Sequence, residues 1–110
     1  MWAKNGDISG KTMNWDDAVN WAKNLHYGGY SDWRLPSKEE FESFSERGGN
    51  KPSEWFNANG FNSVHASNYW SSTTDANSTD LAWGVYMHDG DVNYGNKAGI
   101  NYAWPVRGGK

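Results

Sequence analysis

The sequence predicts an α+β domain in which two α-helices pack on a small twisted antiparallel β-sheet with long loops. Two observations lead to this prediction. The first half holds two segments with helix start signals and apolar residues spaced for one helix face. Residues 69–107 instead hold short segments with turn signals between them. A length of 110 residues favours a single domain over residues 1–110.

The first helix is predicted to follow a short strand at residues 1–8, which breaks at Asn5-Gly6. Asn14 is a good N-cap, and Asp16-Asp17 lies in the first turn, where the helix dipole favours carboxylates. Gly28-Gly29 is expected to end the helix. Its apolar residues fall within one stripe: Trp15, Ala18, Val19, Trp21, Ala22 and Leu25.

The second helix is predicted to begin at Ser37, because Ser37-Lys-Glu-Glu40 forms a capping box. Phe41 and Phe44 give this helix an apolar face, and Arg47-Gly48-Gly49 closes it. Residues 48–68 are rich in glycine, asparagine and serine and are expected to be mostly loop. A loop of this length needs anchors in the core, and its aromatic residues are the candidates: Trp55, Phe56 and Phe61.

The last third is expected to be antiparallel sheet. Its predicted strands are Tyr69–Thr73, Leu81–His88, Asp91–Tyr94 and Tyr102–Arg107. Pro105 cannot donate a ladder hydrogen bond, so we expect it at an edge or a bulge.

The middle two strands are predicted to form a hairpin, since Asp89-Gly90 is typical of a two-residue type I′ turn. Such a turn pairs His88 with Asp91 and Met87 with Val92. One face of this hairpin must then belong to the core: Leu81, Trp83, Val85, Met87, Val92 and Tyr94. The opposite face is polar and aromatic, and we expect it to be exposed.

This second face is the best candidate for ligand binding in the sequence. Asparagine, tyrosine and aspartate can bind sugar hydroxyls or a protein partner through amide hydrogen bonds and ring stacking. The alternative interpretation is an ordinary solvated sheet face. The candidate residues, with those of the adjoining loop, are Tyr86, His88, Asp91, Asn93, Asn96, Lys97 and Asn101.

Composition excludes several function classes. The net charge is −3 and the ten lysines and arginines form no run, which argues against nucleic-acid binding. No apolar segment is long enough to span a membrane, and no signal peptide is present. Cysteine is absent, which excludes disulfides and thiol chemistry. Eight tryptophans, six tyrosines and four phenylalanines predict an aromatic-rich core.

Other combinations of residues have structural explanations. Asp32, Arg34 and Arg107 are expected to form an ion pair that ties the connection between the two helices to the last strand. The loop Asp75–Asp80, or Asp89 with Asp91, could chelate Ca²⁺, but neither has the spacing of an EF-hand. His26, His65 and His88 are isolated in the sequence, with no His-x-x-x-His spacing and no paired carboxylate near any of them. We therefore predict no metal, no cofactor and no enzymatic activity.

Five motifs in order give the chain a resemblance to a known family. They are Trp15-Asp-Asp-Ala-Val19, Gly28-Gly-Tyr-Ser-Asp-Trp-Arg-Leu-Pro36, Tyr69-Trp-Ser-Ser-Thr73, Asp89-Gly-Asp-Val-Asn-Tyr94 and Val106-Arg-Gly-Gly109. Together they resemble the C-terminal domain family of the Legionella collagen-like adhesin, a bacterial domain of unknown function. That family is similar to the formylglycine-generating-enzyme branch of the C-type lectin-like fold, with two helices on a small sheet and neighbouring termini.

The resemblance implies a non-catalytic module, secreted or on the cell surface, that binds a glycan or another surface ligand. The alternative is a structural domain that oligomerises, as a trimer in the adhesin, or caps a larger surface protein. The adhesin's binding to sulfated glycosaminoglycans does not fit the charge of this chain. Its cysteine pair is also missing, because Leu25-His26 and Pro105 stand in those regions.

Overall fold

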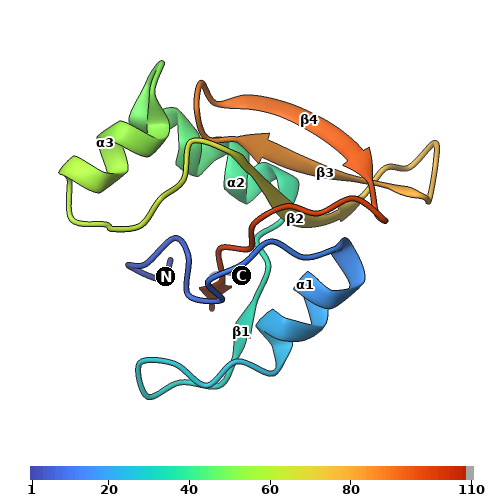
Figure 1. Ribbon diagram of the computed structural model, residues 1–110, viewed down its shortest axis with the longest axis horizontal. Helices are drawn as coiled ribbons and strands as arrows, with labels where there is room; N and C mark the ends of the chain where they lie inside the picture. Colours follow the sequence, from blue (N-terminus) through green and yellow to red (C-terminus); the bar gives the residue numbers. More distant parts are fainter. Residues whose placement is uncertain (109–110) are drawn as a thin grey trace.

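Figure 1 shows the computed structural model of the protein, of which residues 1–108 are described. Strands β2, β3 and β4 form one antiparallel sheet in that order, and β1 pairs antiparallel with β5 in a second. The fold is α+β, as predicted. Its elements are α1 (Trp15–Lys23), β1 (Trp33–Arg34), α2 (Lys38–Ser45), the 3-10 helix η1 (Glu46–Gly48), α3 (Pro52–Ala58), β2 (Asn68–Thr74), β3 (Leu81–Tyr86), β4 (Asp91–Asn96) and β5 (Val106–Arg107).

The start of α1 is as predicted, but its end is not. The Asn14 side chain accepts a hydrogen bond from the Asp17 amide at 2.9 Å. The helix ends at Lys23 with Asn24 as its C-cap, whose side chain also donates to the Asn20 carbonyl at 2.8 Å. Gly28-Gly29 instead forms a two-residue turn, since both residues have positive φ and the flanking tyrosines exchange two backbone hydrogen bonds.

Helix α2 confirms the predicted capping box, because Ser37 and Glu40 each accept a hydrogen bond from the other's backbone amide. Helix α3 was not expected, since residues 48–68 were predicted to be mostly loop. It begins with Pro52, which suits the first helical position. Phe56 then stacks on Phe44 of α2, with ring centroids 4.3 Å apart, so a short helix is held by tertiary packing.

The β3–β4 hairpin differs from the predicted register by two residues. Tyr86, not His88, pairs with Asp91, and residues 87–90 form the turn. Asp89 does not have the positive φ that a type I′ turn requires. Met87 leaves the ladder because it is fully buried, its amide donates to Ser67, and its carbonyl accepts from Ser53 of α3.

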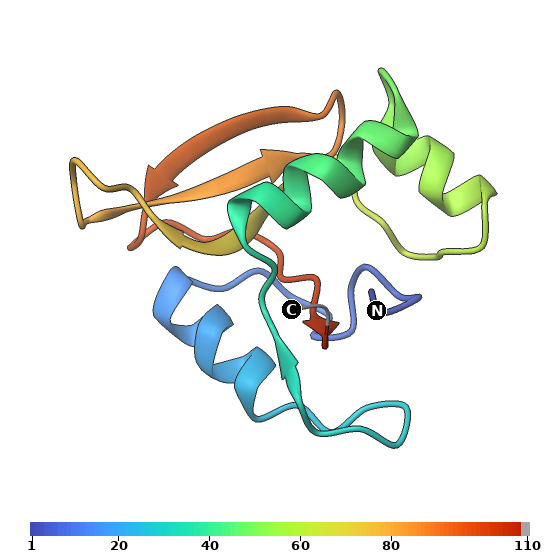
Figure 2. The ribbon, with the colours of Figure 1, turned by 180° about the vertical axis from the view of Figure 1, so that it is seen from behind.

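The two-residue shift keeps the same side chains on each face, but neither face is wholly core or wholly exposed. Figure 2 shows α2 lying across one face of the sheet, where it buries Val85. On that same face Tyr94 stays 56% exposed, because the helix stops short of it. The opposite face buries Trp70 and Ala82 in a second apolar cluster with α1.

The core is aromatic-rich, as predicted. Four tryptophan indoles donate to backbone carbonyls elsewhere in the chain, so each ring links separate segments. These bonds run from Trp15 to Ser71, from Trp33 to Tyr27, from Trp70 to Met13 and from Trp104 to Ala3. Phe56 is fully buried, and Trp55 and Phe61 pack against the same cluster, which confirms the predicted anchors.

The two ends of the described chain lie together, as Figure 1 shows. No strand forms over residues 1–8. Isolated bridges there join Trp2 to Val106 and Asn5 to Asn62, and a turn follows at residues 6–9. The last strand is likewise shorter than predicted, because only Val106–Arg107 pairs with β1 and Pro105 lies outside it. Gly109, in the last family motif, lies outside the described residues.

Candidate functional site

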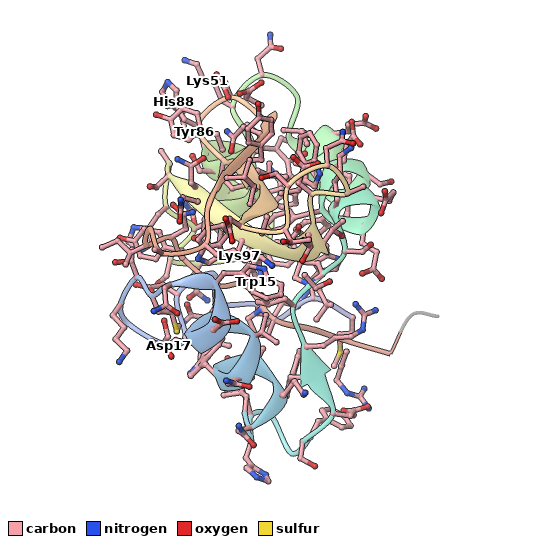
Figure 3. All side chains as sticks on the ribbon, turned by 90° about the vertical axis from the view of Figure 1, so that its right-hand side faces the viewer. Trp15, Asp17, Lys51, Tyr86, His88 and Lys97 are labelled. Atoms are coloured by element: carbon pink, nitrogen blue, oxygen red, sulfur yellow. The ribbon has the colours of Figure 1, made fainter. Side chains whose placement is uncertain are left out.

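The structure divides the seven predicted ligand-binding residues into three groups. Tyr86, His88 and Asp91 lie at the turn end of the β3–β4 hairpin. Lys97 lies apart from them, beside α1 (Figure 3). The remaining three line a groove on the sheet face opposite α2: Asn93, Asn96 and Asn101.

At the turn end, the three residues form a loose cluster. The rings of Tyr86 and His88 lie 5.5 Å apart, and Tyr86 is paired with Asp91 across the two strands. The Asp91 amide donates to the Asp89 side chain at 2.9 Å, which closes the turn. His88 and Asp91 are exposed, and none of the three residues lines the groove on the sheet face. These three residues are therefore weaker candidates for ligand binding than the residues that line the groove.

The groove has a volume of about 240 Å³ and is lined by β2, β3, β4 and the segment 99–101. Sequence reasoning missed most of its lining, because β2 and the segment 99–101 come beside the hairpin only through long-range contacts and the small residues contribute by lacking side chains. The lining residues are Asn68, Tyr69, Trp70, Ala82, Gly84, Asn93, Tyr94, Gly95, Asn96, Gly99, Ile100 and Asn101, and none carries a formal charge at neutral pH.

Small residues on this face create the hollow. Ala82 pairs with Gly95, and Gly84 pairs with Asn93, so two glycines lie diagonally across the strands. A β-carbon at Gly95 would meet no atom within 4 Å. A β-carbon at Gly84 would lie 2.5 Å from the Tyr69 carbonyl oxygen, so this glycine allows β2 to approach β3 closely.

The groove asparagines keep hydrogen-bonding capacity. Asn93 donates to the side-chain oxygen of Asn68 at 3.3 Å, which leaves its own oxygen free to accept. The Asn96 side chain accepts from the Ala98 amide, so its nitrogen is available as a donor. Asn101 pairs with Met13 through its backbone alone, and its side chain makes no hydrogen bond to the described residues. Unpaired amide atoms of these residues therefore lie in or beside one uncharged space, with Asn96 at the end of β4.

Lys97 makes contacts that hold the fold together. Its ammonium lies 3.0 Å from the Thr74 hydroxyl and 4.1 Å from the ring centroid of Trp15. Its carbonyl accepts from the Trp15 amide at the start of α1. Lys97 thus ties α1 to the end of β4, and Figure 3 shows it next to Trp15.

The arginines near the chain ends form two separate ion pairs. Arg107 binds Asp32 through two hydrogen bonds, at 2.7 and 3.1 Å, which confirms the predicted tie to the last strand. Arg34 binds Glu40 through two bonds of 2.8 Å, and not Asp32. The Arg107 hydrogen bonds lower the pKa of Asp32. Those of Arg34 lower the pKa of Glu40 to about 2.

We expect Glu40→Gln to lower the free energy of unfolding by about 1 kcal/mol at neutral pH, since the pair is partly exposed. Glutamine can still cap Ser37, so the loss reports the ion pair. A depressed carboxyl pKa adds stability above its unfolded value near 4.5, and this is lost as the pH falls toward 2. Urea unfolding of both proteins should show their difference shrinking over that range. A difference independent of pH would contradict the assignment.

The histidine interpretation needs one correction. His65 is not isolated, because its Nε2 lies 2.8 Å from the Asp7 carboxylate, which is 58 residues away in sequence. Its ring also stacks on Tyr102 with centroids 4.2 Å apart.

The possible calcium ligands serve turns, since Asp75 and Asp89 each accept a backbone amide two residues ahead. Over residues 1–108, no three histidine or acidic side chains gather as a metal site. No helix in the same range is long and apolar enough to cross a membrane.

These features define a small α+β domain with an uncharged, asparagine-lined groove on one sheet face. The family model of the Lcl C-terminal domain matches residues 1–107, so the chain belongs to that family. The family supports the description as an adhesin-like bacterial domain of unknown function. No curated protein matches the sequence.

Proposed function

We propose that the domain is a non-catalytic recognition module of C-type lectin-like fold that binds a glycan in the β3–β4 groove, outside the bacterial cell. The groove is the observation on which the proposal depends. Each asparagine amide donates from its nitrogen and accepts at its oxygen. Neighbouring amides can therefore bind adjacent hydroxyls of a sugar ring, each of which is also both donor and acceptor.

The chemistry of the groove favours binding over catalysis. Its lining contains no carboxylate, histidine, lysine or serine that could act as an acid, base or nucleophile. Burial raises the pKa of Tyr69 far above its usual range, and its hydroxyl donates to the Gly6 carbonyl at 2.8 Å. That hydroxyl therefore stays protonated and occupied in the core.

Filling the groove tests the proposal. Gly95→Val adds side-chain volume in open space, and valine suits a strand. On an array of neutral and sulfated glycans, we expect the wild type to bind and Gly95→Val to bind at least about tenfold more weakly. Asn20→Ala is the matched control, because Asn20 is exposed on α1 and its side chain makes no hydrogen bond to the described residues. Unchanged binding by Gly95→Val would refute the site.

An assembly domain is the second candidate, and exposed apolar side chains near β4 favour it. Tyr94 is 56% exposed and Ile100 is 65% exposed. Strand β4 is also an edge of the three-stranded sheet. If these residues formed a subunit contact, light scattering should give an oligomer for the wild type and a monomer for Tyr94→Ser. A monomeric wild type would exclude this candidate.

A further inference from the structure

We infer that the groove accepts an uncharged sugar, one ring at a time, and disfavours sulfated or carboxylated sugars. This inference rests on the proposed function and specifies its ligand class. It follows from three features of the structure: the charges that flank the groove, the positions of the cationic side chains, and the volume of the groove.

Carboxylates flank the groove at both ends. At the turn end, an oxygen of the Asp91 side chain lies 3.5 Å from the Asn93 amide nitrogen. At the other end, Asn96 also lines a neighbouring hollow that contains Asp16 and Asp80. An anionic ligand in the groove would therefore lie between like charges, which disfavours binding.

The groove lining contains no lysine or arginine, and in the neighbouring hollow Lys97 offsets one of the two carboxylates. Lys97 lines the neighbouring hollow, but its nitrogen is bound to Thr74 and lies over the Trp15 ring. Arg34 and Arg107 belong to the β1–β5 sheet, and each is bound by a carboxylate. The interactions that usually bind sulfate, which are arginine and lysine hydrogen bonds, are thus directed elsewhere in the described chain.

The groove is small, so a single sugar ring, free or as one unit of a longer glycan, would fill it. Pockets that enclose drug-sized molecules have roughly 300–1,000 Å³, and this groove has about 240 Å³. Ile100 is 65% exposed at the groove and can cover the apolar face of a ring. The Asn93 side-chain oxygen, the Asn101 side-chain amide and, at the end of β4, the Asn96 nitrogen then remain for its hydroxyls. These proportions fit one ring better than an extended chain.

Ligand-observed NMR titration tests the inference. The probes are free glucose, galactose, mannose and the two N-acetylhexosamines, each beside its 6-sulfate. We expect at least one uncharged sugar to bind, with its 6-sulfate at least about tenfold weaker. The affinity of the uncharged sugar should change less than about twofold between low and high salt, because this sugar forms no ion pair with the protein. Gly95→Val and the isosteric Asn93→Asp should each weaken binding by about tenfold or more, whereas Asn20→Ala should not.

The other outcomes separate this inference from the proposed function. Tighter binding of a 6-sulfate than of its uncharged parent, lost in Gly95→Val, would overturn the inference and leave the groove as the recognition site. Binding of 6-sulfates that survives Gly95→Val would overturn both the inference and the groove. Absence of binding by any probe to the folded wild type would also overturn both.

Discussion

Replacing Trp104 by alanine is expected to lower the free energy of unfolding by about 3–5 kcal/mol. Trp104 is fully buried, and its indole nitrogen donates to the Ala3 carbonyl at 2.8 Å. Six aromatic rings surround it with centroids 5.2–6.3 Å away. They come from the N-terminal segment, α2, α3, β2 and the loop after α3. Since a domain of this size has only about 5–15 kcal/mol of stability, Trp104→Ala should be marginally folded.

Trp83→Ala is the control for this prediction, because Trp83 is only partly buried and packs beneath Lys38 near the sheet surface. Urea unfolding followed by circular dichroism should show a loss of about 1 kcal/mol for this variant. Equal losses for the two variants would contradict the assignment of Trp104 as the centre of the core.

The glycines of the groove give the second large effect. Gly84→Ala is expected to cost about 2–3 kcal/mol, because its β-carbon would press on the Tyr69 carbonyl and separate β2 from β3. Gly95→Ala should be neutral or slightly stabilising, since its β-carbon enters open space and alanine has less backbone freedom to lose on folding.

Both glycine variants can be compared in one denaturant series with the wild type. Substantial destabilisation by Gly95→Ala would mean that the hollow beside β4 is filled. Wild-type stability of Gly84→Ala would show that the two strands are not in close contact. The expected pattern would also establish that Gly95 variants with altered binding are properly folded.

Local signals predicted the parts of the fold that depend on neighbouring residues. The start of α1 at Asn14 and the capping box at Ser37 follow from hydrogen bonds within one helical turn. The hairpin side chains were assigned to the correct faces although the predicted register was wrong. Side chains alternate between faces with a period of two, so a shift of two residues leaves each one on the same face. The ion pair between Asp32 and Arg107 agrees with its prediction as well.

Tertiary contacts determined the parts that were wrong. Helix α3 depends on stacking of Phe56 against Phe44, which its own seven residues do not reveal. The hairpin register depends on Met87, whose backbone bonds lie outside β4. Asp89-Gly90 does not form the predicted two-residue turn. Gly28-Gly29, which was predicted to end the first helix, forms such a turn instead, because both glycines tolerate positive φ.

The candidate site was predicted in part for the same reason. Asn93, Asn96 and Asn101 were named from the sequence, and all three line the groove. Lys97 was named with them, but its contacts with Trp15 could not be read from spacing. Asn68 and Gly95 were missed, because one comes from a different strand and the other contributes only by having no side chain.

The most direct test of the account is a two-dimensional amide NMR spectrum recorded while the best-binding uncharged sugar is added. If the groove is the site, the side-chain amides of Asn93 and Asn101 and the backbone amide of Gly95 should shift together and saturate with one affinity. Signals from α1 and from the β1–β5 sheet should stay in place. Shifts confined to the arginines of the β1–β5 sheet or to the hairpin turn would contradict the account and place recognition on another surface.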